Sequence, residues 1–276
     1  MTVAARRSTR QGKDRRGRVA VVGIGPGGID HITTRAIDEL RSADSIVGFG
    51  LYVNQIRSII RSNARVYSSG MGHEIDRASL ALELASRGRR VAVVSSGDPG
   101  VYGMAGPIIE TVNKLRMKVD VVVVPGVTAA TASAASLGAP LMTDFAAISL
   151  SDLMVPRNKI LERVESALKG DFVLVLYNPQ SRSRKEPLRL VHQMLMKYRK
   201  PNTPIGIVTA YGRAGERTTV TTLVRMLDHE IDMESTVIIG NSSTKIFDGK
   251  ILTPRGYYSR GQPTRSRTRT PSCTLR

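Results

Sequence analysis

Val-Val-Gly-Ile-Gly-Pro-Gly-Gly at residues 21–28 and Val-Val-Ser-Ser-Gly-Asp-Pro-Gly at residues 93–100 decide the fold of this chain. Each stretch is an apolar run that ends near glycine, which is typical of a buried strand followed by a tight loop. Gly23, Gly25 and Gly28 also match the pattern G-x-G-x-x-G, which in dinucleotide-binding proteins brings the backbone close to a pyrophosphate. The first turn could therefore be a dinucleotide site or the loop of a different ligand site.

Three features of the first turn argue against a dinucleotide. Pro26 removes one of the N–H donors that a phosphate would use. The helical pattern begins only near Thr33, so the glycines do not open the helix. The next predicted strand, at 45–49, has no carboxylate at its end to bind a ribose, since Asp44 precedes it. We therefore disfavour a hydride-transferring enzyme.

Composition limits the class of protein. The chain has 276 residues, of which 41% are hydrophobic, and this allows one large or two ordinary α/β domains. No apolar run approaches the roughly 20 residues that span a membrane, and we expect no secretory signal. The single cysteine, Cys273, and four scattered histidines offer no metal-ligand spacing. We expect a cytoplasmic protein with no membrane contact and no metal.

The net charge of +18 is unevenly distributed. Residues 1–18 contribute seven Lys/Arg and one Asp, and residues 255–276 contribute six Arg and no acid. We expect residues 1–17 and 255–276 to be basic, disordered tails. Basic tails can attract nucleic acid, but solvated tails are commoner, so a nucleic-acid partner is not expected. The remaining positive charge of the body suits an acidic substrate.

Strand and helix patterns alternate along the body, which predicts an α/β fold with an N-terminal domain at 18–143 and a C-terminal domain at 144–254. Strands are predicted near 18–23, 45–49, 90–95, 119–124, 146–150, 172–177, 204–209 and 235–240. Helices are predicted near 33–43, 74–88, 104–116, 127–135, 157–169, 186–198 and 221–228. Polar or glycine-containing loops follow strands in the second half as well, at 177–181, 209–213 and 239–241. Because open α/β sheets bind ligands at the carboxyl ends of strands, a cleft between the two halves is the expected ligand site.

Three motifs in this order carry a family resemblance: Gly-Ile-Gly-Pro-Gly at 23–27, Ser-Gly-Asp-Pro-Gly-Val-Tyr-Gly at 96–103 and Pro-Gly-Val-Thr-Ala-Ala at 125–130. Together they resemble the tetrapyrrole methylases, the S-adenosylmethionine-dependent enzymes of cobalamin and sirohaem biosynthesis. The resemblance covers about residues 18–253 and leaves the tails outside. Two further stretches, 176–182 and 206–216, resemble the precorrin-3B C17-methyltransferase branch of that family.

The resemblance implies two α/β domains, a homodimer, and S-adenosylmethionine bound in the cleft between the domains. The implied reaction methylates C17 of precorrin-3B and contracts the ring to precorrin-4. The positions that would contact the cofactor are Gly97, Asp98, Val101, Thr128, Ala129, Asn178 and Ala210. The positions that would border the tetrapyrrole are Gly25, Pro26, Gly27, Arg182 and Arg213. Arginine suits the second role because its fork binds carboxylates, and methyl transfer itself needs orientation more than a strong acid or base.

Several alternatives stay open at this stage. Asp98 could be a turn former in Asp-Pro-Gly and nothing more. Ring contraction calls for acid–base help, and Tyr52, His73, Glu74 and Arg213 lie in suitable loops, although each also has an ordinary structural interpretation. No catalytic residue is therefore assigned. The same fold could methylate a different precorrin or RNA, or the chain could be a basic RNA-associated protein without activity.

Overall fold

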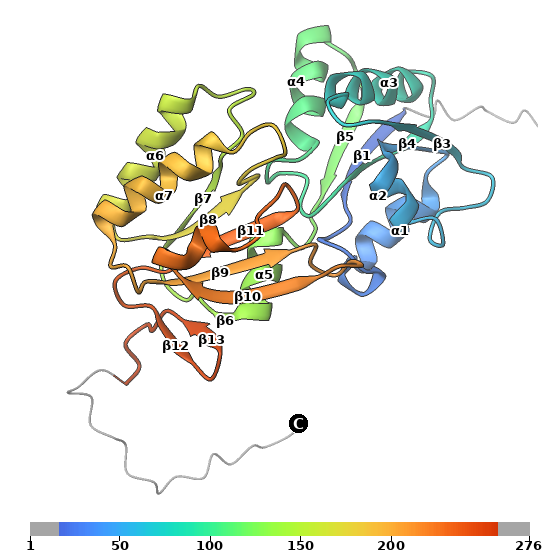
Figure 1. Cartoon of the computed structure of the whole chain (residues 1–276). Coiled ribbons are helices and arrows are strands. Elements are labelled where there is room, and N and C mark those ends of the chain that lie inside the picture. Colours follow the sequence, from blue (N-terminus) through green and yellow to red (C-terminus); the bar gives the residue numbers. More distant parts are fainter. Residues whose placement is uncertain (1–16, 259–276) are drawn as a thin grey trace, which may run out of the picture.

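The computed structural model describes residues 17–258, so the two predicted tails lie almost entirely outside the described residues. Strands in this range form two separate five-stranded sheets, which Figure 1 shows side by side with β1–β5 on the right. A small three-stranded sheet joins β12 (Lys245–Phe247), β13 (Lys250–Leu252) and β6 (Gly138–Ala139). The α/β class predicted from the alternating pattern is confirmed.

The first sheet is parallel throughout and has the order β3-β2-β4-β1-β5. Its strands are β1 (Arg18–Gly23), β2 (Ser45–Phe49), β3 (Arg65–Ser69), β4 (Arg90–Ser95) and β5 (Asp120–Val124). Because all five run the same way, the loops that follow β1, β4 and β5 meet at one edge. This edge carries all three motifs of the family resemblance.

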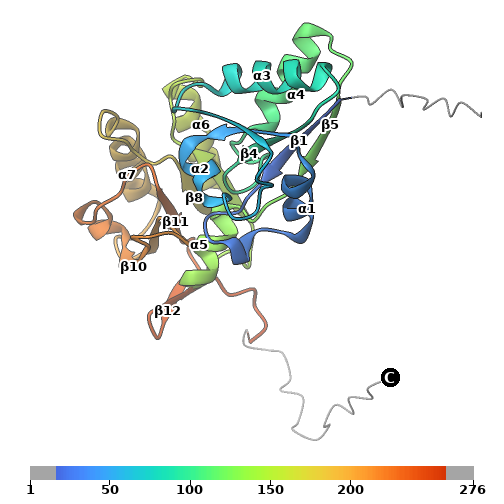
Figure 2. The same cartoon turned by 90° about the vertical axis from the view of Figure 1, so that its right-hand side faces the viewer.

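Helices cover both faces of the first sheet, as Figure 2 shows with α3 and α4 above the strands and α1 below them. The helices are α1 (Thr34–Ser42), α2 (Gly50–Gln55), α3 (Glu74–Ser86) and α4 (Ala105–Leu115). Alternate residues of β1 serve the two faces: Ala20 and Val22 join the cluster under α1 and α2, and Val19 and Val21 join the cluster under α3 and α4. Burial on both faces explains the unbroken apolar runs in these strands.

The second sheet is mixed and has the order β10-β9-β11-β8-β7. Its strands are β7 (Phe145–Ser149), β8 (Val173–Tyr177), β9 (Pro204–Thr209), β10 (Arg217–Thr222) and β11 (Ser235–Ile239). β7 pairs parallel with β8, and β11 runs antiparallel to both β8 and β9. The ends of β7, β8 and β9 therefore share one edge, and the end of β11 lies at the other.

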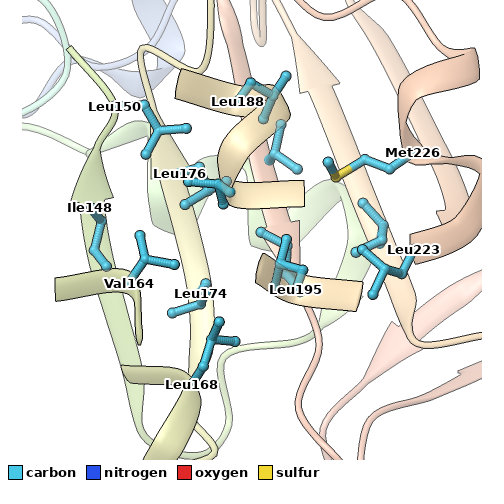
Figure 3. Packing of buried hydrophobic residues seen from close by; sticks show 14 of the residues in the cluster. Ile148, Leu150, Val164, Leu168, Leu174, Leu176, Leu188, Leu195, Leu223 and Met226 are labelled. Atoms are coloured by element: carbon cyan, nitrogen blue, oxygen red, sulfur yellow. The ribbon is translucent and has the colours of Figure 1, made fainter. Parts of the chain in front are cut away.

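One side of the second sheet is covered by α6 (Arg157–Lys169), α7 (Glu186–Tyr198) and the 3-10 helix η2 (Leu223–Asp228). Figure 3 shows the core beneath them, where Leu174 and Leu176 of β8 meet Val164, Leu188 and Leu195. The other side is covered by α5 (Ala129–Leu137), whose Ala130, Ala134 and Leu137 pack against Val175 and Val208. The chain thus crosses from the first sheet to the second through α5.

The structure corrects two sequence predictions. The helix predicted at 221–228 is wrong in type, because β10 occupies 217–222 and only a 3-10 helix follows. The loop at 239–241 is not at the ligand edge, because β11 is reversed and Gly240 N–H bonds to the carbonyl of Pro204 at the start of β9, 2.9 Å away. The division at residue 143 stays a prediction, since α5 belongs by sequence to the first half and by packing to the second sheet.

Candidate functional site

The two glycine turns, at residues 21–28 and 93–100, are bonded to each other. Gly97 N–H donates to the carbonyl of Gly25 at 2.7 Å, and Gly25 N–H donates to the carbonyl of Gly97 at 3.2 Å. Gly126, in the loop after β5, packs so tightly that an added Cβ would overlap the carbonyl oxygen of Gly97 and lie 2.9 Å from the carbonyl carbon of Gly23. The three loops form one backbone-to-backbone assembly that admits only glycine at this contact.

Asp98 holds this assembly together with both carboxylate oxygens. Oδ1 accepts from the N–H of Gly100 at 2.8 Å, which closes the turn, and Oδ2 accepts from the N–H of Gly126 at 3.0 Å. The turn-forming interpretation of Asp98 is therefore confirmed, with an added link to the third loop that sequence inspection missed. Its role toward a cofactor stays a prediction.

Two tyrosines connect the first sheet's loops to the second sheet. The hydroxyl of Tyr177, the last residue of β8, bonds to Oγ1 of Thr128 at 2.6 Å and accepts from Ala130 N–H at 2.9 Å. The hydroxyl of Tyr102, in the loop after β4, donates to the carbonyl of Ala147 at 2.9 Å and accepts from Ser149 N–H at 3.1 Å. The two rings lie 5.2 Å apart. Neither tyrosine was singled out from the sequence.

Three of the six non-glycine residues with positive φ among residues 17–258 lie at the same place. Tyr102, Asn178 and Ala210 have φ values of 53°, 48° and 52°, the left-handed region that non-glycine residues rarely adopt. Such strain persists only where surrounding contacts impose it, and it concentrates at ligand sites. Two of these three residues, Asn178 and Ala210, are predicted cofactor contacts.

Arg184 contacts the backbone at Asn178. Its guanidinium donates to the carbonyls of Leu150 at 2.6 Å and Asn178 at 3.0 Å, and it lies 3.8 Å from the carboxylate of Asp152. The amide of Asn178 donates to Oγ of Ser149 at 3.0 Å. The loops after β7 and β8 are thereby fixed to each other. No sequence signal distinguishes Arg184, because its neighbour Arg182 has the same local chemistry.

The first turn contacts the second sheet directly. Gly27 and Gly212 face each other so closely that a Cβ on Gly212 would lie 2.7 Å from the carbonyl oxygen of Gly27. His31 Nδ1 donates to that carbonyl at 2.9 Å, and the His31 ring meets the Tyr211 ring edge-on at 5.3 Å. Gly25, Pro26 and Gly27 are all buried in the protein. The three predicted tetrapyrrole-facing residues of this turn therefore sit at the junction of the two sheets.

The two predicted substrate arginines differ. Arg213 forms an ion pair with Glu234 at 2.7 Å, its side chain is 21% exposed, and its Nε finds no partner among residues 17–258. Arg182 is exposed in the loop after β8, and within the described range it pairs with no carboxylate. Arg182 is thus the freer of the two to bind a substrate carboxylate.

The predicted acid–base candidates are held by structural contacts. His73 Nδ1 bonds to Asp76 at 2.8 Å and Glu74 pairs with Arg77 at 3.0 Å, both at the start of α3. Tyr52 packs edge-on to Phe49 at 5.2 Å and against the core under α2. Within the part of the chain that the structure describes, none of the three contacts the loops of Gly97, Thr128 or Asn178, so the structure does not gather them into the loop assembly.

The described residues include no helix that is both long and apolar enough for a transmembrane segment. No group of three or more His, Cys, Asp or Glu side chains within residues 17–258 is arranged to bind a metal ion.

Comparison with known proteins agrees with this geometry. Residues 18–226 match the family model described as "Tetrapyrrole (Corrin/Porphyrin) Methylases". The chain is 43% identical over 239 residues to a probable cobalt-factor III C(17)-methyltransferase of Salmonella typhimurium, which covers 87% of the chain and 99% of that protein. It is also 43% identical over 246 residues to a cobalt-factor III methyltransferase of Priestia megaterium, which covers 88% of the chain and 45% of that protein.

Among solved structures, the crystal structure of the methyltransferase CobJ superposes with a TM-score of 0.81 at 36% sequence identity, covering 86% of this chain and all of that one. The chain thus spans the full length of some relatives and about half the length of others.

Proposed function

This chain belongs to the tetrapyrrole methylase family, and we propose that it transfers a methyl group from S-adenosylmethionine to C17 of a precorrin-3B-type macrocycle, with ring contraction to the precorrin-4 level. One observation carries the proposal. The loops after β1, β4 and β5 meet the loops after β8 and β9, and these five loops hold every predicted cofactor contact. The Salmonella typhimurium relative, which matches 87% of the chain, is named a probable cobalt-factor III C(17)-methyltransferase, and the solved structure that matches 86% of the chain is named a methyltransferase.

The residues present fit such a cofactor. The loops offer backbone groups and small side chains at Gly97, Thr128, Ala129 and Ala210, so a ligand can approach the main chain closely. Thr128 gives α5 no side-chain cap of its own, and of the first N–H groups of the helix that of Ala130 is bonded to the hydroxyl of Tyr177. Asn178 and Ala210 are held in strained conformations that only surrounding contacts can maintain.

Methyl transfer at these loops needs little acid or base catalysis. S-adenosylmethionine supplies an electrophilic methyl group: a carbon–carbon bond forms at C17 as the carbon–sulfur bond breaks, and the bonding electrons remain on sulfur. The protein's contribution is alignment of the two reacting atoms, which rigid, cross-linked loops provide. The carboxylate of Asp98, whose two oxygens already accept backbone N–H groups, acts in this scheme by fixing the loops.

The relatives at 43% identity are named for cobalt-factor III, and this favours a cobalt-loaded macrocycle as the substrate. Purified protein with S-adenosylmethionine is therefore offered metal-free precorrin-3B and cobalt-factor III in parallel. Methyl transfer adds one methyl mass to the macrocycle and changes its absorption spectrum. If neither macrocycle is methylated while a known enzyme of this type converts the same preparations, the proposed function is wrong.

We also propose a homodimer, which light scattering on the purified protein would establish or refute.

An RNA substrate is the alternative to the macrocycle, since the chain carries a net charge of +18. RNA binding of this kind would weaken steeply with salt. Methylation of RNA, with the macrocycles left unchanged, would replace the proposed function by this alternative.

A further inference from the structure

Tyr102 and Tyr177 form a reciprocal brace across the two sheets. Tyr102 lies in the loop after β4 of the first sheet. Its hydroxyl bonds to the backbone of β7 in the second sheet, at Ala147 and Ser149. Tyr177 starts on the second sheet and bonds to Thr128 and Ala130, which follow the last strand of the first. The rings touch in a tilted arrangement with centroids 5.2 Å apart, so each tyrosine supports the other.

The hydroxyl of Tyr177 acts as the N-terminal cap of α5. Thr128 is the cap residue by position, yet its own side chain caps no helical N–H group, and Tyr177 accepts from Ala130 instead. A cap of this kind is worth about 1 kcal/mol to a helix. It also links the first turn of α5 to the end of β8.

One hydroxyl hydrogen of the Thr128–Tyr177 pair is not used in the bonds described above. Two hydroxyl hydrogens, one on Thr128 and one on Tyr177, share a single bond of 2.6 Å between the two oxygens. The bond from Ala130 uses a lone pair of Tyr177 and no further hydroxyl hydrogen. Within residues 17–258 the second hydroxyl hydrogen has no acceptor, so the pair can donate one O–H to a bound molecule.

We propose that Tyr177 and Tyr102 are positioning residues for the cofactor: they align the loop after β4 with the start of α5, and the Thr128–Tyr177 pair donates one hydroxyl hydrogen to a polar acceptor on the cofactor. This inference rests on the proposed function. Burial raises the pKa of the Tyr177 phenol above its ordinary value of 10.0, so the hydroxyl is protonated at neutral pH. Tyr102 is 56% exposed and still makes two backbone bonds, which points to a role in alignment more than in core packing.

The test is the affinity for S-adenosylhomocysteine, measured by calorimetry, in Tyr177→Phe and Tyr102→Phe. Phenylalanine keeps the ring and removes only the hydroxyl. Tyr198→Phe is the matched control, because that tyrosine also loses one hydroxyl bond, to Glu165 at 2.6 Å, between α6 and α7. We expect the dissociation constant to rise about tenfold for Tyr177→Phe and severalfold for Tyr102→Phe, and to stay unchanged for Tyr198→Phe.

A second readout needs no ligand. In the free protein, hydrogen exchange at the Ala130 amide should accelerate in Tyr177→Phe and not in Tyr198→Phe, and the unfolding free energies of the two brace variants should be non-additive. Equal affinities in all variants, when the wild type binds, would overturn the positioning role. A wild type that does not bind S-adenosylhomocysteine would refute the proposed function instead, and additive unfolding energies would then refute the brace itself.

Discussion

At the residue scale, the contact between Gly126 and Gly97 makes the sharpest prediction. In Gly126→Ala the new methyl group meets only backbone atoms of Gly97 and Gly23, which have no side chain that can move aside. We expect a loss of about 3 kcal/mol in the free energy of unfolding and loss of S-adenosylhomocysteine binding. Gly106→Ala on α4 is the control: its Cβ meets nothing within 4 Å, so alanine should be neutral or stabilising by about 0.5–1 kcal/mol. Urea unfolding measures both, and a stable, binding Gly126→Ala would contradict the tight contact.

A second residue-scale prediction concerns pH. Hydrogen bonds from Arg157, helped by the charge of Arg184, lower the pKa of Asp152 below its ordinary value of 3.8. The folded state thus binds this proton more weakly than the unfolded state, so the stabilisation is complete above the ordinary pKa and is lost as the pH falls through the lower, folded value.

Asp152→Asn should therefore lower the free energy of unfolding by about 1 kcal/mol at pH 7, a modest loss because Arg157 is partly exposed. Below pH 4 the variant should lose less stability than the wild type as the pH falls. Glu162→Gln, which breaks an exposed pair with Lys159, serves as the control and should change little. Thermal unfolding between pH 2.5 and 7 measures the effect. If the stabilities of Asp152→Asn and the wild type change with pH in parallel, the lowered pKa of Asp152 does not contribute to stability as described.

The same scale shows what the sequence can predict about the site. The family resemblance named Gly97 and Asp98 as cofactor contacts, and that role stays a prediction; the turn at Asp98 was predictable from the sequence itself, because Asp-Pro-Gly reports local backbone geometry. Tyr177 and Arg184 were missed because each acts through a contact between segments far apart in the chain: Tyr177 reaches Thr128, and Arg184 reaches Leu150. Nothing local distinguishes Arg184 from Arg182, and only the fold assigns one to a buried network and leaves the other exposed.

At the element scale, α5 decides how the two sheets are joined. Its Leu137 is 1% exposed and packs into the space left by Gly206 on β9, where an added Cβ would lie 2.7 Å from Leu137 Cδ2. Leu137→Ala should lower the free energy of unfolding by about 2–5 kcal/mol, because α5 loses the side chain that packs against β9 of the second sheet. Leu153→Ala, at an 83% exposed position, should cost nearly nothing.

The double variant Leu137→Ala/Gly206→Ala makes the contact itself testable. Gly206→Ala alone should destabilise the protein by forcing Leu137 aside, but in the Leu137→Ala background the new methyl group enters the vacated space. The double variant should therefore be more stable than the sum of the single effects, by about 1 kcal/mol. Additive effects in denaturant titrations would show that α5 and β9 do not pack as described.

The sequence predicts some helices and strands better than others. The sequence pattern predicted α6 and α7 with their observed bounds, since both are amphipathic helices with clear limits. It does not predict β10, because the helix predicted at 221–228 overlaps the end of this strand, although Arg-Thr-Thr-Val-Thr-Thr at 217–222 is rich in β-branched residues. It also could not give the direction of β11. A buried apolar strand has the same pattern in either direction, so the reversal that moves Gly240 to the opposite edge follows only from pairing.

At the scale of the whole molecule, the class of fold followed from the sequence, and the assembly of the site did not. The alternating pattern predicted α/β sheets, and the order of the three glycine-containing motifs predicted the family. The way the sheets meet depends on contacts such as Gly27 with Gly212 and Tyr102 with β7, which join segments more than 40 residues apart. Such contacts leave no periodic signal in a single sequence.

Net charge acts at the scale of the whole molecule: residues 1–18 carry +6, residues 255–276 carry +6, and the body between them carries the remaining +6 of the total of +18. A precorrin carries several carboxylates, and a strongly positive protein should speed its capture through long-range attraction that salt screens over about 10 Å at 0.1 M. Raising the salt concentration from about 50 to 300 mM should therefore increase KM for the macrocycle roughly severalfold. The affinity for S-adenosylhomocysteine, which has little net charge, should hardly change, and kcat should stay constant because the loops that align the reacting atoms are held by short internal hydrogen bonds. A KM independent of salt would mean that the positive charge plays no part in substrate capture.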